Sequence, residues 1–92
     1  MGRMTSTYEV KLTRLVVRDV GRLQPKIRSQ IDRRFEELKS NPRPHDTKRL
    51  VGRRRSYRID SGEYRILYDV DDEARLVAVW RVRHRRDVYR NL

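Results

Sequence analysis

Three short β-type segments joined by two tight polar turns are the feature that most constrains the fold of this chain. Residues 57–60, 64–70 and 76–82 alternate apolar with polar side chains or are rich in residues that favour strands. Residues 61–63 and 71–73, which connect them, are polar or glycine. Connections this short reverse the chain and cannot support parallel pairing. The sequence therefore predicts an antiparallel meander of three strands.

The two-residue period of a strand divides these side chains between two faces. The predicted core face carries mostly large apolar side chains: Tyr57, Ile59, Tyr64, Ile66, Tyr68, Val70, Leu76, Ala78, Trp80 and Val82. The predicted opposite face becomes increasingly rich in arginine: Arg58, Asp60, Arg65, Leu67, Asp69, Val77, Val79, Arg81, Arg83 and Arg85. Guanidinium groups on neighbouring strands repel one another unless anions bind to them, so this second face is predicted to hold phosphates. The position of Trp80 on the first face favours packing in the core over stacking on RNA.

The charge balance indicates the class of partner. The chain has 92 residues, of which 24 are Lys or Arg and 13 are Asp or Glu, so its net charge is +11. This length predicts one domain, residues 1–92, with one modest core. The charge favours nucleic acid or an acidic protein as the partner, whereas the basic amphipathic helix expected of a membrane-binding chain is not evident.

The absence of certain residue types excludes several kinds of site. Without cysteine the chain has no disulfide, no cysteine-bound zinc and no thiol nucleophile. Two histidines alone do not make an ordinary metal site and no cofactor motif is present, so we expect neither a metal nor a small-molecule cofactor. No apolar segment approaches the roughly 18 residues of a membrane span and no signal-peptide core follows the start, which makes the cytoplasm the expected location.

The N-terminal part predicts a strand followed by two helices. Residues 7–12 alternate at period two, and Thr13 is a suitable N-cap for a short helix that weakens at Gly21. Pro25 suits the first turn of a second helix, which residues 40–42 end. The helical side chains expected to face the sheet are Leu15, Val16, Val20, Leu23, Ile27, Ile31, Phe35 and Leu38. Packing them on the apolar sheet face predicts an α+β fold of two layers, a helical hairpin on a largely antiparallel four-stranded sheet.

Residues 41–52 are polar and interrupted by proline, so we expect a loop across the edge of the sheet. The neighbouring His45 and Asp46 are expected to be solvated, because no third group positions them for catalysis. The carboxylates of residues 69–73 are likewise expected in a solvated turn rather than a metal site. Six basic residues and no acidic one occur between Lys48 and Arg58, and this run leads into the arginine-rich face. The predicted RNA-binding residues are Lys48, Arg49, Arg53, Arg54, Arg55, Arg81 and Arg83.

Cleavage of RNA is one reaction that arginine and tyrosine side chains could support. The 2′-hydroxyl of RNA can attack the adjacent phosphate, so the protein has to align the attack, stabilise charge on the phosphate and handle two protons. Arginine binds phosphate bidentately and keeps its charge. Tyr89, four residues after Arg85, is a candidate base, because a cluster of arginines favours a phenolate. A purely structural role for Tyr89, packed on the sheet, is an equal alternative.

A resemblance to a known family rests on two segments, KRLVGRRRSYRI and GEYRILYDVDDEARLVAVWRVRHRRDVYR. They closely resemble the RelE branch of the RelE/ParE toxin superfamily, the toxins of type II toxin–antitoxin pairs, and the likeness extends over nearly the whole chain. The resemblance implies two N-terminal helices on a largely antiparallel sheet. It also implies a metal-independent ribonuclease that cuts messenger RNA in the ribosomal A site by 2′-hydroxyl attack, leaving a cyclic phosphate, and that is bound by a cognate antitoxin.

The resemblance also implies a role for each catalytic residue. Arg58 is expected to stabilise charge on the phosphate, Arg65 to bind the phosphate and Arg85 to protonate the leaving group. Tyr89 is expected to orient or deprotonate the 2′-hydroxyl. The chain departs from the family at Asp60, where the best-known members have a lysine, and a carboxylate there would repel the phosphate or act as the base.

Two alternatives remain within the superfamily. ParE-like members have the same scaffold and poison DNA gyrase without cutting RNA, and a relative without catalytic activity could bind an antitoxin alone. His84 matches a histidine that is common in relatives, but its position in the alternation directs it toward the core.

Overall fold

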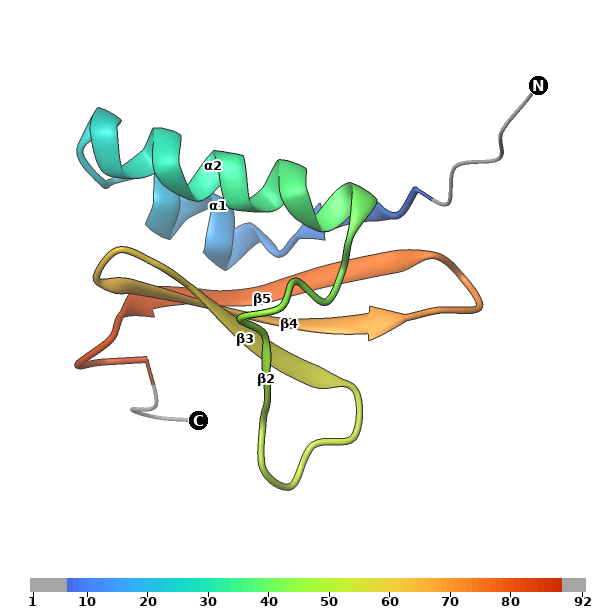
Figure 1. Cartoon of the computed structure of the whole chain (residues 1–92). Coiled ribbons are helices and arrows are strands. Elements are labelled where there is room, and N and C mark those ends of the chain that lie inside the picture. Colours follow the sequence, from blue (N-terminus) through green and yellow to red (C-terminus); the bar gives the residue numbers. More distant parts are fainter. Residues whose placement is uncertain (1–6, 89–92) are drawn as a thin grey trace.

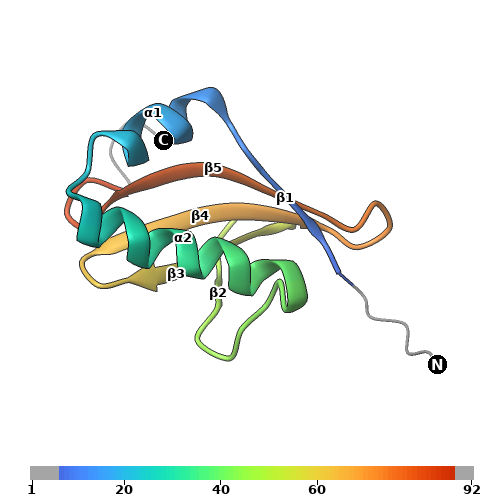
Figure 2. The same ribbon diagram turned by 90° about the horizontal axis from the view of Figure 1, so that it is seen from above.

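The computed structural model describes residues 7–88 and arranges them in two layers (Figure 1). In chain order, the elements are β1 (Glu9–Leu12), α1 (Arg14–Gly21), α2 (Pro25–Ser40), β2 (Lys48–Arg49), β3 (Ser56–Ser61), β4 (Tyr64–Asp71) and β5 (Leu76–His84). Both helices of this described part lie on one side of the sheet, and the view from above shows them across it (Figure 2). The predicted α+β fold of two layers is therefore confirmed.

The sheet within residues 7–88 has five strands in the order β1-β5-β4-β3-β2. The predicted meander is confirmed, because β3 pairs with β4 and β4 with β5, both antiparallel. The first strand, β1, pairs parallel with β5, from Glu9 opposite Leu76 to Leu12 opposite Val79. The expected strand count of four was wrong by one, because the loop predicted at residues 41–52 contains β2.

Strand β2 gave no signal in the sequence. It consists of two exposed basic residues, Lys48 and Arg49, which pair with Arg58 and Tyr57 of β3. Such a pair of residues has no apolar side to reveal the alternation that marks a strand.

The helices begin where the sequence places them. The Thr13 hydroxyl accepts a hydrogen bond from the Val16 backbone amide at 3.2 Å, which caps α1, and α1 ends at Gly21. Pro25 occupies the first turn of α2. The predicted apolar stripe is confirmed except at Leu15, which is 46% exposed. The short α1 buries only Val16 and Val20 fully against the sheet, and Leu15 lies beside that contact.

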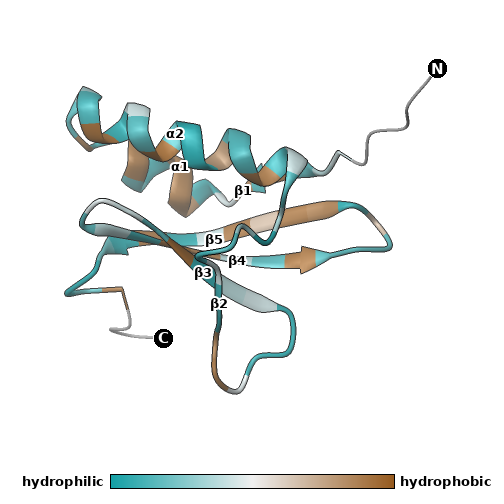
Figure 3. Ribbon diagram, viewed as in Figure 1, coloured by the Kyte–Doolittle hydropathy of each residue, from teal (hydrophilic) through white to brown (hydrophobic). Residues whose placement is uncertain are grey.

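The core between the helices and the sheet confirms the alternation in β3 and β4 but not in β5. Ile59, Ile66, Tyr68 and Val70 belong to the core, with Tyr57 and Tyr64 packed at its margin. Figure 3 shows hydrophobic residues on both helices and on the long strands of the sheet, with hydrophilic residues between them.

A β-bulge in β5 overturns the predicted core face of this strand. Tyr68 pairs with Val79 but the preceding Leu67 pairs with Arg81, so Trp80 is an extra residue between the two pairs. An inserted residue reverses the alternation on either side of it. The core side chains of β5 are therefore Val77, Val79 and Val82. The predicted core positions of Leu76, Ala78 and Trp80 were wrong, as was the placement of Val77 and Val79 on the opposite face.

The opposite face of the sheet is partly covered by the turn that follows β5. Arg81 Nη1 donates a hydrogen bond to the Val88 carbonyl at 3.1 Å, which holds residue 88 over the row of β4 and β5 that contains Leu67. Leu67 and Val88 are both fully buried, although neither belongs to the main core. The turn after β5 thus lies on the side of the sheet away from the helices (Figure 1).

A polar cluster around Asp72 joins four segments at one end of the sheet. Arg43, in the loop after α2, donates to both carboxylate oxygens of Asp72 at 3.2 and 2.7 Å. Tyr8, just before β1, donates to Asp72 Oδ1 at 2.7 Å. Arg43 Nε also donates to the Tyr57 hydroxyl of β3 at 3.1 Å. The hydrogen bonds from Arg43 and then Tyr8 lower the pKa of Asp72 to about 2.

We expect Asp72→Asn to lower the thermal stability in a way that depends on pH. An unfolded aspartate has a pKa of about 3.9, so the ionised Asp72 favours the folded state above about pH 4. This contribution is lost as the pH falls through the folded-state pKa of about 2. Thermal unfolding should therefore show a lower Tm for the variant at pH 7 and a difference that disappears toward pH 2.

Glu73→Gln is the matched control for this experiment. Glu73 is the next residue in the same turn, and it is exposed and forms no ion pair with another residue of the described chain. An equal loss of Tm from both substitutions at pH 7 would show that the Asp72 contacts contribute nothing specific.

Candidate functional site

Three rows of cross-strand neighbours cover the side of the sheet away from the helices. The rows are Ser56–Asp69–Ala78, Arg58–Leu67–Arg81 and Asp60–Arg65–Arg83, each running from β3 through β4 to β5. We call the four arginines of these rows, Arg58, Arg65, Arg81 and Arg83, the arginine face. All four lie on the face that the sequence predicted for them, and the bulge at Trp80 leaves Arg81 and Arg83 in line with Arg58 and Arg65.

Asp60 lies between two arginines of this face. Its Oδ1 atom is 3.3 Å from Arg65 Nε and 3.5 Å from Arg58 Nη1. The side chains of Arg58 and Arg65 are 21% and 26% exposed, whereas that of Asp60 is 51% exposed. The carboxylate therefore sits on the solvent side of two confined guanidinium groups, in a place where a phosphate oxygen could replace it.

Arg83 is directly opposite Arg65 in the pairing of β4 with β5. Like charges at such a position destabilise a sheet. Arg83 Nε lies 3.8 Å from Asp19 Oδ2 of α1, so a helix residue offsets part of this charge.

The turn after β5 carries Arg85, whose side chain is 59% exposed. Its backbone amide donates to the Glu63 carbonyl at 2.8 Å, and its Nε atom lies 3.4 Å from Glu63 Oε1. Gly62, with a φ of 59°, makes the tight β3–β4 turn that presents Glu63 to this contact. Arg85 is thus next to the third row but outside the arginine face. Tyr89, the other predicted catalytic residue beyond β5, lies outside the described residues.

His84 faces the core side of the sheet, as its position in the sequence predicted. Its ring packs edge-on against Tyr64 with the centroids 5.5 Å apart, and its Nε2 atom lies 3.4 Å from Glu63 Oε1. His84 is therefore separated from the arginine face by the sheet.

The other predicted RNA-binding residues lie on β2 and on the loop from β2 to β3. Lys48 and Arg49 form β2, and the loop carries Arg53, Arg54 and Arg55. The Leu50 amide donates to the Ser56 carbonyl at 3.0 Å, and the Val70 amide donates to the Arg55 carbonyl at 3.0 Å. These bonds fix both ends of the loop to the sheet.

Trp80 is a residue of this surface that the sequence did not predict. Its indole nitrogen donates to Asp69 Oδ1 at 2.9 Å, and the guanidinium carbon of Arg53 lies 4.5 Å from its ring centroid. Ser56 donates to the same Asp69 oxygen at 2.6 Å. Only the pairing of β5 with β4 reveals that Trp80 faces this side, so the alternation within β5 could not have found it.

The other sequence candidates lie away from the arginine face. Asp46 accepts two hydrogen bonds from Arg34 Nη2, and these bonds lower its pKa against the opposite effect of burial. Within residues 7–88, no group of three or more histidine, aspartate or glutamate side chains is arranged to hold a metal ion. None of the helices in that range is long and apolar enough to cross a membrane.

Comparison with known proteins gives consistent matches. Residues 10–89 match the family model described as "ParE toxin of type II toxin-antitoxin system, parDE". The chain is 35% identical over 88 residues to Toxin RelG of Mycobacterium tuberculosis, which covers 90% of this chain and 97% of the relative.

Solved structures show the same fold. The toxin–antitoxin complex RelBE2 from Mycobacterium tuberculosis contains a chain that is 32% identical, with a TM-score of 0.73, over 85% of this chain and 98% of that one. The intact E. coli RelBE toxin–antitoxin complex gives 28% identity and a TM-score of 0.72, over 82% of this chain and 93% of that one.

We expect Asp60→Asn to lower the free energy of unfolding by up to about 1 kcal/mol at low salt, the range measured for exposed ion pairs. The substitution keeps the size of the side chain but removes the negative charge that lies beside Arg58 and Arg65. Unfolding in urea is measured at about 0.01 M and about 1 M NaCl. The difference in unfolding free energy between the variant and the parent should shrink at the higher salt, because the Debye length is shorter there.

Asp32→Asn, on the exposed side of α2, removes the same charge where no ion pair exists among the described residues and serves as the control. A loss at Asp60 that is equal at both salt concentrations would mean that the carboxylate does not act through its charge.

Proposed function

The chain belongs to the RelE/ParE superfamily of type II toxins, and from this we propose that it inhibits translation by cutting messenger RNA on the ribosome. The observation that carries the proposal is the arginine face, in which four arginines from three adjacent strands share one side of the sheet and two of them, Arg58 and Arg65, flank the carboxylate of Asp60. A basic surface of this kind favours a polyanion, and a confined pair of arginines favours a single phosphate within it. The proposed site of action is the cytoplasm, where the ribosomes are.

The proposed reaction uses the substrate's own nucleophile. The 2′-oxygen of the ribose attacks the adjacent phosphorus, forms a new P–O bond and displaces the 5′-oxygen of the next nucleotide. The products are a 2′,3′-cyclic phosphate and a free 5′-hydroxyl. One proton leaves the 2′-hydroxyl and one joins the departing 5′-oxygen, so the step is neutral overall.

Arg58 and Arg65 are the proposed phosphate-binding pair. In the free protein both contact Asp60, and the scissile phosphate would take its place between them. Their guanidinium groups would then stabilise the additional negative charge that the phosphorus acquires during attack. Both side chains have limited exposure, so their guanidinium groups need little rearrangement when the 2′-oxygen attacks.

The two protons are assigned by the family resemblance. Arg85 is the proposed group beside the leaving 5′-oxygen, and its exposed position next to the third row is compatible with contact to RNA. Tyr89 is the proposed group beside the 2′-hydroxyl. Asp60 is an alternative base, because displacement from Arg58 and Arg65 by the phosphate would leave its carboxylate free to accept a proton.

An antitoxin is the proposed protein partner, because the related toxins described above were solved as complexes with antitoxins. A groove of about 310 Å3 between β1 and α2 is lined by three apolar side chains, those of Val10, Leu12 and Phe35, and by three charged ones, those of Asp32, Glu36 and Lys39. Strand β1 is at the edge of the sheet, so one side of its backbone is available to a further strand. An antitoxin segment that folds on binding could cover this groove.

The match to the ParE family model favours one alternative, inhibition of DNA gyrase without cleavage of RNA. The arginine face would then bind DNA or an acidic protein surface. The two functions differ in their products, because only the first one creates new RNA ends.

We expect Arg65→Ala to reduce the rate of messenger RNA cleavage about 10²–10³-fold, or about 2.7–4 kcal/mol, the loss found when one preorganised donor to developing charge is removed. Ribosome binding should change far less, because the other basic residues remain. The measurement is the rate of appearance of new 5′-ends on ribosome-bound messenger RNA.

Arg33→Ala, on the exposed side of α2, is the control that removes the same charge on the other side of the sheet. A message with a 2′-deoxy nucleotide at the cleavage position should resist the parent protein. Cutting of that message would exclude the mechanism, and gyrase-dependent DNA breaks without any RNA ends would favour the ParE-like function.

We expect Val10→Thr to weaken antitoxin binding about fivefold, because a hydroxyl in an apolar contact costs roughly 1 kcal/mol. The test co-expresses the chain with the product of the neighbouring small open reading frame and measures the affinity of the purified complex. Val17→Thr is the control, since Val17 is 56% exposed on α1 and does not line the groove. Equal affinity of both variants would place the contact elsewhere.

A further inference from the structure

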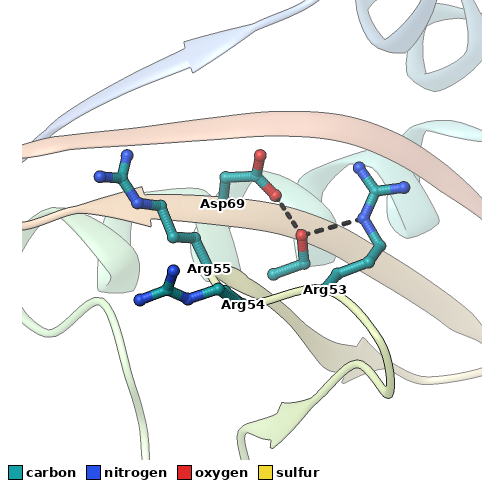
Figure 4. Close-up of a pocket in the computed structure, with 5 residues that line it drawn as sticks. Arg53, Arg54, Arg55 and Asp69 are labelled. Atoms are coloured by element: carbon teal, nitrogen blue, oxygen red, sulfur yellow. Dashed lines mark hydrogen bonds between the residues drawn. The ribbon is translucent and has the colours of Figure 1, made fainter.

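A second concave site lies beside the arginine face. A pocket of about 510 Å3 is lined by Arg53, Arg54, Arg55, Ser56 and Asp69. This volume is within the range of pockets that bind small ligands. Figure 4 shows Arg53 on one side of Asp69, with Arg54 and Arg55 on the other. The pocket thus has two basic walls.

A closed ring of contacts fixes one of these walls. Arg53 Nε donates to the Ser56 hydroxyl at 3.2 Å, and this hydroxyl donates to Asp69 Oδ1 at 2.6 Å (Figure 4). Trp80 donates to the same oxygen, and the Arg53 guanidinium stacks on the Trp80 ring at 4.5 Å. Arg53 is therefore held over the indole by two contacts, and the residue remains exposed to solvent.

The second wall carries positive charge that contacts within the described residues neutralise only weakly. Among the described residues, the Arg54 guanidinium makes no hydrogen bond or ion pair. Arg55 is 69% exposed and reaches Asp71 only at 3.7 Å. Three arginines against one aspartate leave the pocket with an excess of positive charge, and that aspartate already accepts two hydrogen bonds on one oxygen.

We propose that this pocket binds one nucleotide of a single-stranded RNA, with its phosphate held by Arg54 and Arg55 and its base stacked on the open side of the Arg53 guanidinium. Guanidinium planes stack on unpaired bases, and an aromatic ring behind the guanidinium supports the stack. Asp69 is a positioning residue here, because it holds both Ser56 and Trp80 and through them Arg53.

The pocket lies in line with the proposed phosphate-binding pair. Asp69 of the pocket and Arg65 of the arginine face are on the same strand, β4, and on the same side of it. Four residues of strand span about 13 Å. This equals about four stacked nucleotides at about 3.4 Å each, so one RNA strand could occupy both places at once. The inference therefore rests on the proposed action on RNA and extends it by a second contact, away from the bond that is cut.

Trp80 provides a direct signal for occupation of the pocket, because it is the single tryptophan of the chain. We would titrate the full chain with inorganic phosphate and with a short single-stranded oligonucleotide that lacks all 2′-hydroxyls and so cannot be cut by the proposed reaction. Both should change the Trp80 fluorescence saturably at low salt, and the oligonucleotide should do so at much lower concentration.

Variants separate the two parts of the pocket. Replacing Arg54 and Arg55 together by serine should weaken oligonucleotide binding about tenfold, abolish the fluorescence change with phosphate, and lower the salt slope by about 0.7, the value for one phosphate of a single strand. Arg53→Lys keeps the charge but loses the planar surface, so it should weaken oligonucleotide binding without changing the slope. The control replaces Arg22 and Arg33, two exposed arginines away from the pocket, by serine and should leave all three quantities unchanged.

Asp69→Asn tests the charge in the opposite direction. An asparagine oxygen can still accept from Ser56 and Trp80, so the ring is kept while a repulsive charge is removed, and phosphate should bind several-fold more tightly. A variant that merely failed to fold could not show tighter binding.

The outcomes distinguish this inference from the proposed function. The nucleotide pocket would be overturned if replacing Arg54 and Arg55 lowered oligonucleotide affinity no more than replacing the control pair, and if Asp69→Asn had no effect. This would hold even if Arg65-dependent cleavage is found. Unchanged oligonucleotide binding together with a weakened antitoxin complex would also overturn it and assign the pocket to the protein partner. Binding with the expected variant effects, but without any cleavage of RNA, would support the pocket and remove the proposed catalytic function.

Discussion

Repulsion between arginines on adjacent strands is the constraint that the rest of this structure has to satisfy. A directly opposed pair such as Arg65 and Arg83 destabilises a sheet, and the face also holds Arg58 and Arg81. Carboxylates from different elements reduce the repulsion without filling the surface. Asp60 forms ion pairs with Arg58 and Arg65, and Asp19 of α1 forms one with Arg83. One side chain of each contact is about half exposed, so a stronger anionic ligand can compete for the arginines.

The fold could be predicted from the sequence wherever one alternation runs through a whole strand. In β3 and β4 the side chains that face the helices are large and apolar and recur every second residue, and the core positions of Ile59, Ile66 and Val70 follow directly. In β5 the same reasoning fails at Trp80. The segment around it is apolar at nearly every position, so its own pattern is equally compatible with either face, and only the pairing of Leu67 with Arg81 shows the inserted residue.

The candidate site shows the same division between local and tertiary information. Arg58 and Arg65 could be assigned to one face from the alternation, because no bulge interrupts their strands. The ring that joins Arg53, Ser56, Asp69 and Trp80 could not, since it depends on a loop, two strands and the bulge together. The contact of Asp60 with both arginines likewise requires the register of β3 on β4. Before the structure, Asp60 stood out only through the family resemblance, which implies a lysine at this position in the best-known members.

The parallel pairing of β1 with β5 has a consequence for how the molecule is made. Glu9 pairs with Leu76, so the first strand of the described chain finds its partner only in the last one. Two of the four residues of the arginine face, Arg81 and Arg83, also belong to that last strand. During synthesis from the N-terminus, the sheet can be completed only after nearly all of this sequence has left the ribosome. A partly synthesised chain that ends before β5 therefore lacks both a closed sheet and a complete arginine face.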